Sequence, residues 1–182
     1  MKAMKILILC GSPHQNGTTN ALADALISGI DQTRHEIEKV QLSGKTIAPC
    51  LGCEHCRRND GVCVHRDNME ALLPSVLAAD VIVFVSPIYY FGFNAQLKAV
   101  IDRFYAVNAR LKQQTEKKAI LLTAGGGREE WIPDGIFANY HTMLRYLNWT
   151  SLGQVCALSC HAKEQLQQTD CLEQAKKLGE SL

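Results

Sequence analysis

The sequence lacks any long apolar run and any excess of charge of one sign. No stretch of its 182 residues approaches the roughly 20 apolar residues of a membrane-spanning helix. The apolar run from Ile6 to Cys10 is also too short for the core of a signal peptide. Lys and Arg number 19 against 18 Asp and Glu, so the net charge of +1 offers no basic surface for a nucleic acid. We therefore expect neither membrane nor nucleic-acid binding.

Residue patterns typical of hydrolases are also missing. The sequence has no paired carboxylates, no Ser-His-Asp order and no His-x-x-x-His metal motif. We interpret His35, His141 and His161 as surface or packing residues.

What remains is the composition of an ordinary folded domain. Hydrophobic residues make up 47% and charged residues 20% of the chain, which predicts a single domain over residues 1–182. Eight cysteines without a recognisable secretion signal indicate a reducing compartment, so we expect a cytoplasmic protein. Clustered thiols in such a compartment bind metals or take part in redox chemistry more often than they form disulfides.

Short apolar runs alternate with amphipathic stretches, which is the rhythm of β-α-β units. Strong runs at 5–10, 81–85 and 119–123 and weaker ones at 35–42 and 150–158 predict five strands. Helical spacing follows Thr19 and Asn94 and recurs near the end of the chain. The pattern predicts an α/β fold with a parallel sheet covered by helices on both faces.

The loop after the first strand, Gly11 to Asn20, predicts an anion site. It is rich in hydroxyl side chains and leads directly into a helix, whose free N–H groups and dipole favour a phosphate. No Lys follows Gly17, which excludes a Walker A loop and favours a single terminal phosphate. Taken alone, the same residues could simply cap the helix. Its position after the first strand of a doubly wound sheet favours the phosphate.

Two further loops predict contacts to a flat ring. Aromatic residues at 86–94 follow the strong run 81–85, and three consecutive glycines at 125–127 follow the strong run 119–123. The alternatives are hydrophobic packing or a subunit interface for the aromatics and plain flexibility for the glycines. Three such loops on one rim of a sheet nevertheless favour a bound cofactor.

The segment 47–67 interrupts this rhythm as a cysteine-rich insertion loop. Cys50, Cys53, Cys56 and Cys63 are separated by two, two and six residues. Closely spaced thiols suit a [4Fe–4S] cluster better than a structural zinc site, which usually takes two separated Cys-x-x-Cys pairs. Free thiols or an air-formed disulfide remain open alternatives, as does zinc.

The chain resembles the NADPH-dependent FMN reductase and flavodoxin-like family. The resemblance rests on Gly11-Ser-Pro with Gly17-Thr-Thr, on Ser86-Pro-Ile-Tyr, and on Ala95-Gln-Leu-Lys with Ile101-Asp-Arg. The cysteine motif is similar to that of the iron-sulfur flavoprotein branch. The resemblance implies a flavodoxin-like three-layer sandwich whose five-stranded parallel sheet has the order 2-1-3-4-5. It also implies FMN held by Ser12, His14, Thr18, Thr19, Asn20, Pro87, Ile88, Tyr89, Tyr90, Phe91, Asn94, Ala124, Gly125 and Gly126.

The function expected from the resemblance is FMN-dependent NAD(P)H oxidation, with electrons passed to a quinone, a nitro or azo compound, or a protein. The first alternative is an iron-sulfur flavoprotein that carries electrons between protein partners. The second is a flavin-sensing interaction module. The aromatic density of 89–93 with Phe104 and Tyr105 predicts a homodimer or homotetramer.

Overall fold

The computed structural model describes residues 2–182. Its elements follow in the order β1 (Lys5–Cys10), α1 (Thr18–Gly29), β2 (Glu36–Gln41), η1 (His55–Arg58), α2 (Asn68–Ala78), β3 (Val81–Tyr89), β4 (Gly92–Phe93), α3 (Ala95–Arg103), η2 (Phe104–Val107), α4 (Asn108–Gln113), β5 (Lys118–Ala124), α5 (Asp134–Leu147), β6 (Thr150–Ala157), α6 (Lys163–Leu166) and α7 (Cys171–Glu180). Strands and helices alternate along most of the chain, as the apolar rhythm predicts.

The sheet has the order β2-β1-β3-β5-β6, and these five strands are parallel. This confirms the predicted order 2-1-3-4-5. A sixth, short strand was not predicted: β4 pairs antiparallel with the end of β3, Ile88 opposite Phe93. The parallel pairing places the carboxyl ends of β1, β3 and β5 side by side, with Cys10 opposite Val85 and Pro87 opposite Ala124.

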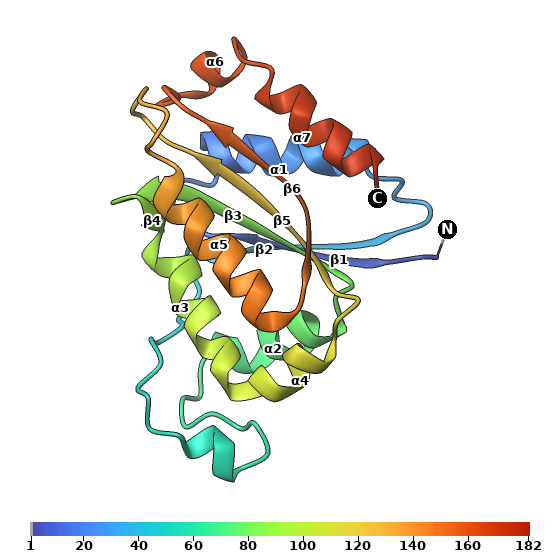
Figure 1. The fold of residues 1–182 in the computed structure, drawn as a ribbon, viewed down its shortest axis with the longest axis vertical. Coiled ribbons are helices and arrows are strands. Elements are labelled where there is room, and N and C mark those ends of the chain that lie inside the picture. Colours follow the sequence, from blue (N-terminus) through green and yellow to red (C-terminus); the bar gives the residue numbers. More distant parts are fainter. Residues whose placement is uncertain (1) are drawn as a thin grey trace.

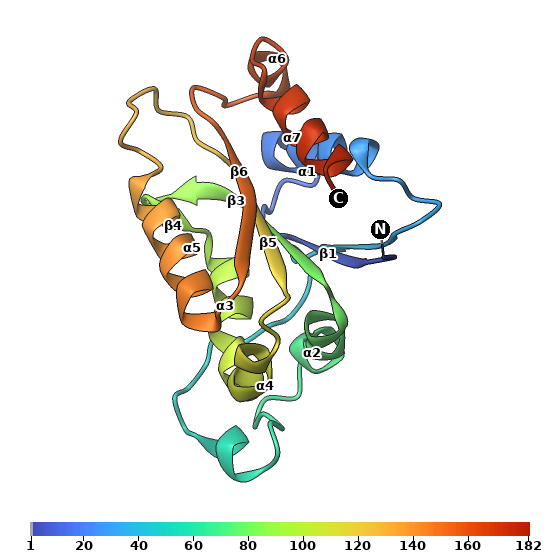
Figure 2. The ribbon, with the colours of Figure 1, turned by 45° about the vertical axis from the view of Figure 1, so that its right-hand side comes forward.

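Helices cover both faces of the sheet (Figures 1 and 2), α1 and α7 on one face and α2, α3 and α5 on the other. Side chains alternate between the faces along each strand: Leu7 and Leu9 join the core under α2 and α3, whereas Ile6 and Ile8 join the core under α1 and α7. All four are fully buried. Strands apolar on both faces are therefore explained by the two helical layers.

Four α-helices are additions to the sequence prediction, α2, α4, α5 and α6. α2 begins after Asp67, whose carboxylate accepts the Met69 N–H at 3.0 Å and caps the helix. Among residues 2–182, no helix combines the length and the apolar character needed to cross a bilayer.

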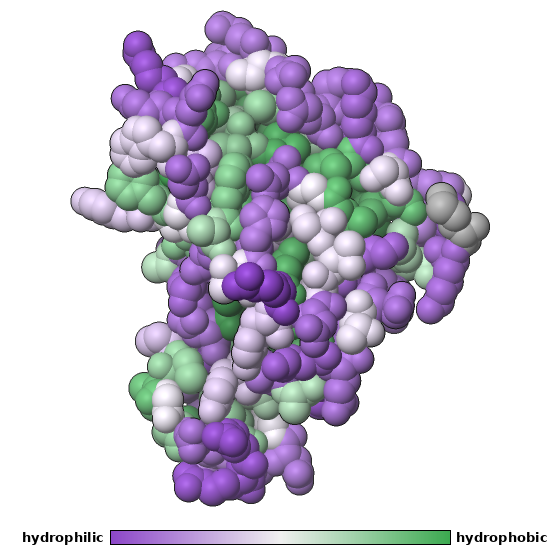
Figure 3. All heavy atoms as spheres, viewed as in Figure 1, coloured by the Kyte–Doolittle hydropathy of each residue, from purple (hydrophilic) through white to green (hydrophobic). Residues whose placement is uncertain are grey.

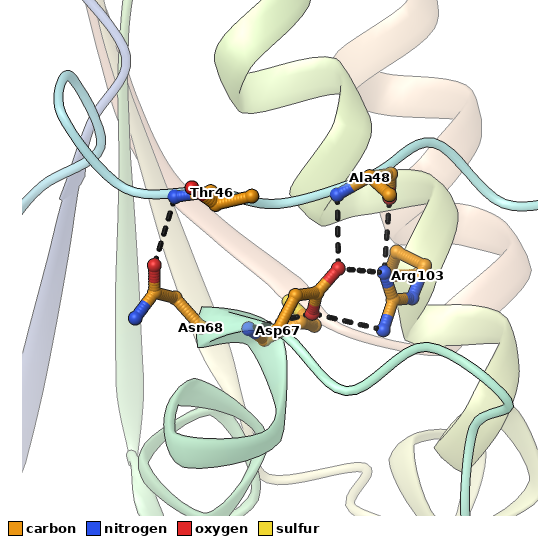
Figure 4. Close-up of polar contacts among 6 residues, drawn as sticks. Thr46, Ala48, Asp67, Asn68 and Arg103 are labelled. Atoms are coloured by element: carbon orange, nitrogen blue, oxygen red, sulfur yellow. Dashed lines mark hydrogen bonds and ion pairs between the residues drawn. The ribbon is translucent and has the colours of Figure 1, made fainter.

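The cysteine loop runs from the end of β2 to the start of α2 and projects from the lower end of the molecule (Figure 1). A buried ion pair closes its base (Figure 4). The Arg103 guanidinium donates to both carboxylate oxygens of Asp67, at 2.8 and 3.2 Å, and to the Ala48 carbonyl at 2.9 Å. Alongside, Thr46 and Asn68 exchange two further hydrogen bonds. Residues near positions 46–48 and 67–68 are thus fixed to the last residue of α3.

The pair is almost completely shielded from water, since the side chains of Arg103 and Asp67 are 2% and 7% exposed. Burial raises the pKa of Asp67, but hydrogen bonds from Arg103 and from the Ala48 and Met69 amides outweigh it and hold the pKa below its ordinary value. A carboxyl group with a lowered pKa in the folded state stabilises the fold above its unfolded pKa. This stabilisation disappears as the pH falls through the folded pKa.

We predict that Asp67→Asn lowers the free energy of unfolding by about 3–5 kcal/mol at pH 7, because it leaves the buried Arg103 charge without its partner. The difference between wild type and variant should begin to shrink below about pH 4, the ordinary pKa of Asp, because Asp67 then becomes protonated in the unfolded chain before it does in the folded protein. Urea titrations at pH 7 and pH 3 measure both effects. Glu38→Gln, at an exposed position on β2, is the control. A difference that does not change with pH would contradict the role of the Asp67 charge.

Candidate flavin site

A cavity of about 830 Å³ opens at the carboxyl ends of the parallel strands. Four loops line it, those that follow β1, β3, β5 and β6. The lining residues are Ser12, Pro13, His14, Gln15, Asn16, Gly17, Thr18, Thr19, Pro87, Ile88, Tyr89, Ala124, Gly125, Gly126, Cys160, His161, Ala162, Lys163 and Glu164. This is the position at which open α/β sheets bind their ligands.

The loop after β1 presents the start of α1 to this cavity. Gly17 occupies the N-cap position and no side chain caps the helix, which leaves the N–H groups of the first turn available to an anion. The loop is shaped from within: the His14 N–H donates to Ser12 Oγ at 3.1 Å, and Asn20 Nδ2 donates to the His14 carbonyl at 3.0 Å. The capping alternative is therefore not what the structure shows, because the hydroxyl side chains leave the helix uncapped.

One buried side chain, Asn94, fastens the loops after β1 and β3 together. Its Nδ2 donates to the Gly11 carbonyl at 2.6 Å. The backbone N–H of Asn94 donates to Ser86 Oγ, and Ser86 Oγ donates to Asn94 Oδ1, both at 3.0 Å. Thr123 Oγ1 at the end of β5 donates to the Ser86 carbonyl at 2.7 Å, which adds a third strand end. A Cβ at Gly11 would lie 2.3 Å from Asn94 Oδ1, so only glycine leaves room for this arrangement.

The aromatic segment forms a tight hairpin between β3 and β4. Tyr90 and Phe91 at its tip have φ angles of +45° and +64°, which bulky residues rarely adopt. Tyr90 is completely exposed, whereas Phe91 packs against Trp131 with ring centroids 5.2 Å apart. Only the base of the hairpin, Ile88 and Tyr89, reaches the cavity. Since neither residue favours a positive φ angle, contacts with the surrounding structure must hold the hairpin in this conformation.

The glycine loop after β5 is joined to the loop after β6 by backbone hydrogen bonds. The Gly125 N–H donates to Ala157, the Ser159 N–H to Gly127 and the Cys160 N–H to Gly125, at 2.9, 2.8 and 3.1 Å. Strand pairing thus continues past the ends of β5 and β6. The two loops form one continuous wall of the cavity.

The loop after β6 is the part of the site that the sequence did not reveal. Cys160 to Glu164 line the cavity, although nothing in their composition predicts a ligand. The available signal was positional, since this loop also follows a parallel strand at the same rim. Burial and the neighbouring Cys171 raise the pKa of Cys160. The thiol therefore stays neutral at neutral pH and adds no negative charge to a site suited to a phosphate.

Ten of the residues expected to hold FMN lie in the cavity wall: Ser12, His14, Thr18, Thr19, Pro87, Ile88, Tyr89, Ala124, Gly125 and Gly126. The other four do not line it. Asn20 and Asn94 are buried supports of the loops, Tyr90 projects into solvent, and Phe91 packs on Trp131. Contact of all fourteen with a cofactor stays a prediction.

The four cysteines of the insertion loop differ in their surroundings. Cys50 and Cys53 are exposed, Cys63 is half-buried and Cys56 is buried within η1. Within residues 2–182, no three His, Cys, Asp or Glu side chains stand close enough together to hold a metal ion. The donor set has the right chemistry for an iron-sulfur cluster, but binding one would require the loop to bring these sulfurs together.

Comparison with known proteins identifies the class. The model of the NADPH-dependent FMN reductase family matches residues 4–155, and the chain belongs to this family. An iron-sulfur flavoprotein of Archaeoglobus fulgidus is 37% identical over 132 residues, which cover 71% of this chain and 58% of that protein. One from Methanosarcina thermophila is 31% identical over 125 residues, or 69% of this chain and 65% of that protein. The matched part of the chain thus spans 58% and 65% of the length of these two relatives.

Solved structures share the whole fold at low sequence identity. A NAD(P)H:quinone oxidoreductase from Methanothermobacter marburgensis superposes with a TM-score of 0.78 at 17% identity, covering 98% of this chain and 96% of that one. An azoreductase from Bacillus anthracis superposes with a TM-score of 0.75 at 17% identity, covering 98% and 100%. These similarities establish the flavodoxin-like architecture.

The cavity fits the mononucleotide that the family name implies. Uncapped amides and hydroxyl groups at α1 suit a terminal phosphate, and no lining Asp or Glu lies on that loop. Gly125 and Gly126 form part of the same cavity wall as Pro87 and Ile88, and a flat ring could lie against this wall. The volume lies within the usual range for sites of small ligands and cofactors, about 300–1,000 Å³.

Proposed function

We propose that the protein is an FMN-dependent NAD(P)H oxidoreductase. The observation that carries the proposal is the joining, in one cavity, of an uncapped helix start with a wall of glycine backbone and the base of an aromatic hairpin. The first feature suits a phosphate and the other two suit a conjugated ring. Membership in the FMN reductase family supports the same assignment.

In this proposal the protein supplies binding and orientation, whereas bound FMN would supply the hydride chemistry. Thr18, Thr19 and the amides of the first turn of α1 would donate hydrogen bonds to the phosphate, and the loop after β1 contributes no Lys or Arg. Pro87, Ile88 and Gly125 lie together at the adjacent ends of β3 and β5, and they would contact the flavin ring from this wall of the cavity. The cavity is open to solvent, so that NAD(P)H and then the acceptor can use the same approach.

The class of electron acceptor follows from the proposal that NAD(P)H and the acceptor reach the flavin from the same open side of the cavity. A flat quinone, nitro or azo compound could stack where the nicotinamide had been, or a protein could dock at the rim. Relatives and structural neighbours include proteins described as a NADH:quinone oxidoreductase and an azoreductase. We propose small-molecule acceptors first, because the rim of the cavity presents the apolar side chains of Tyr89 and Ile88.

We predict that Ser12→Ala with Thr19→Ala weakens FMN binding at least tenfold, because it removes two hydroxyl groups from the phosphate loop. Fluorescence titration with FMN measures the affinity, and circular dichroism checks the fold. Ser28→Ala with Thr33→Ala, at surface positions away from the cavity, is the matched control. Unchanged affinity in the loop variant would refute the phosphate assignment.

A second candidate function is electron carriage between proteins, for which the cysteine loop is the specific observation. Four thiols lie on a single loop whose base is fixed by the pair Arg103 and Asp67 (Figure 4). The relatives named iron-sulfur flavoproteins favour a [4Fe–4S] cluster here. Exposed Leu51, Val62 and Val64 on the same loop would suit a docking protein, and apolar atoms show at this lower end in Figure 3.

We predict that anaerobic reconstitution loads iron and sulfide in a stoichiometric ratio of about four each per chain onto the wild type. Cys53→Ser with Cys56→Ser should lose this binding, whereas Cys10→Ser, at a buried position in β1, should keep it. Iron and sulfide assays with the visible spectrum measure the outcome. If the Cys53 and Cys56 variant bound as much iron and sulfide as the wild type, these cysteines would not hold a cluster, and the protein would be an FMN reductase without one. Zinc found in place of iron would refute the cluster.

We also propose that the chain forms a homodimer at the aromatic rim of the cavity. Tyr89, Tyr90, Phe91 and Trp131 are each exposed by 45% or more, and the hairpin forms a projection on the left of Figure 3. Such an apolar projection is more than a free surface usually carries. Phe104, which we expected to contribute, is instead buried against Phe84, so the expectation was wrong for this residue.

Sedimentation at micromolar concentration should therefore show a dimer, and Tyr90→Asp should shift it toward monomer because the charge would be buried in the interface. Tyr146→Asp, near the carboxyl end of α5, is the control for an exposed tyrosine elsewhere. A wild type that sediments as a monomer with flavin bound would contradict the proposal. So would a Tyr90 variant that remains a dimer.

A further inference from the structure

His161 is an exposed polar residue of the cavity wall, and its side chain forms no hydrogen bond with the described part of the chain. It follows β6 in the loop that the sequence did not single out, and it lines the cavity. Among residues 2–182, neither ring nitrogen of His161 forms a hydrogen bond; the only hydrogen bond of this residue is its N–H to Gln165 Oε1, at 2.7 Å. The imidazole is therefore available to a ligand in the cavity.

The position of the ring is set by its surroundings. Gln165 Oε1 also accepts the Ala162 N–H at 3.0 Å, and so fixes the backbone on both sides of the His161 side chain. The ring lies against Gly126: a Cβ at that position would fall 2.1 Å from Cε1 and 2.6 to 2.7 Å from the two nitrogens. Gly126 thus provides the space that the imidazole occupies.

The other charged or titratable groups of the wall do not duplicate this position. His14 belongs to the phosphate loop after β1, and Lys163 and Glu164 begin α6 beyond His161. Cys160, directly before it, has its thiol directed to the Leu158 carbonyl at 3.2 Å. Within the part of the cavity wall formed by the loops after β5 and β6, His161 offers the ring nitrogens that can pair with a heterocycle.

We propose that His161 is a cofactor-binding residue, whose imidazole hydrogen-bonds to a polar edge of the flavin beside Gly126. The inference rests on the proposed FMN site and deepens it by assigning a fourth loop to it. A flavin ring carries carbonyl and ring-nitrogen groups along one edge, and an imidazole can donate to or accept from such groups. Because Gly126 has no side chain, it leaves room for the imidazole in the position from which it would contact the flavin.

The test compares FMN affinity in His161→Ala, His161→Gln and wild type, using titration of flavin fluorescence. His161→Ala should bind FMN about three- to tenfold more weakly, and His161→Gln should recover most of the loss because its amide can donate and accept. His141→Ala, an exposed histidine on α5 outside the cavity, should bind FMN like wild type. Unfolding midpoints of all variants show whether the fold is intact.

A double-mutant cycle examines the contact with Gly126 separately. Gly126→Ala should weaken FMN binding in wild type, because the new Cβ displaces the imidazole, and should cost much less in the His161→Ala background. Affinity of His161→Ala equal to or tighter than wild type would overturn the proposal. So would a His161→Gln variant as weak as His161→Ala, or a Gly126→Ala cost that is the same in both backgrounds. If wild type itself binds no FMN, the proposed function fails, and that result is distinguishable from all of these.

Discussion

The side chain of Asn94 is the constraint on which the geometry of the flavin site depends. It is completely buried, and its amide joins the backbone of Gly11 to the hydroxyl of Ser86. Two loops that come from different strands are therefore held at a fixed separation, and Thr123 ties the end of β5 to the same point. A buried amide with satisfied donors and acceptors specifies one arrangement, because any displacement leaves polar groups unpaired.

Hydrogen bonds within the protein hold the walls of the cavity. The loops after β5 and β6 are joined to each other by backbone hydrogen bonds, so they form one wall that internal contacts keep in place. Loops held in this way lose less entropy on binding than loops that a cofactor must order. The positive φ angles of Tyr90 and Phe91 are maintained by the same framework, since Phe91 rests on Trp131. The rim keeps its aromatic surface in a defined position.

The sequence could predict the strands from their hydrophobic pattern and three of the loops from their residue types. Short apolar runs locate the strands, and hydroxyl, aromatic and glycine residues mark three of the four loops at the rim. Contacts between distant residues carry no such signal. Asn94 was expected to touch the cofactor, yet it faces Gly11, 83 positions away in the sequence. His161 is exposed and its ring packs on Gly126, in agreement with its interpretation as a surface or packing residue, but only the fold shows that it lines the cavity.

The helix α3 relates the two parts of the molecule that the sequence treats as separate. Asn94 precedes its first residue and Arg103 is its last, so one short helix of about 13 Å connects the loops of the cavity to the base of the cysteine loop. Both ends are anchored by buried polar contacts, Asn94 to Gly11 and Arg103 to Asp67 and Ala48. A rearrangement of the cysteines beyond that base can therefore occur without disturbing the cavity. Loss of the ion pair between Arg103 and Asp67 would instead free the cysteine loop and expose one end of the helix that positions Asn94. This ion pair is therefore the structural link between the thiols and the flavin site.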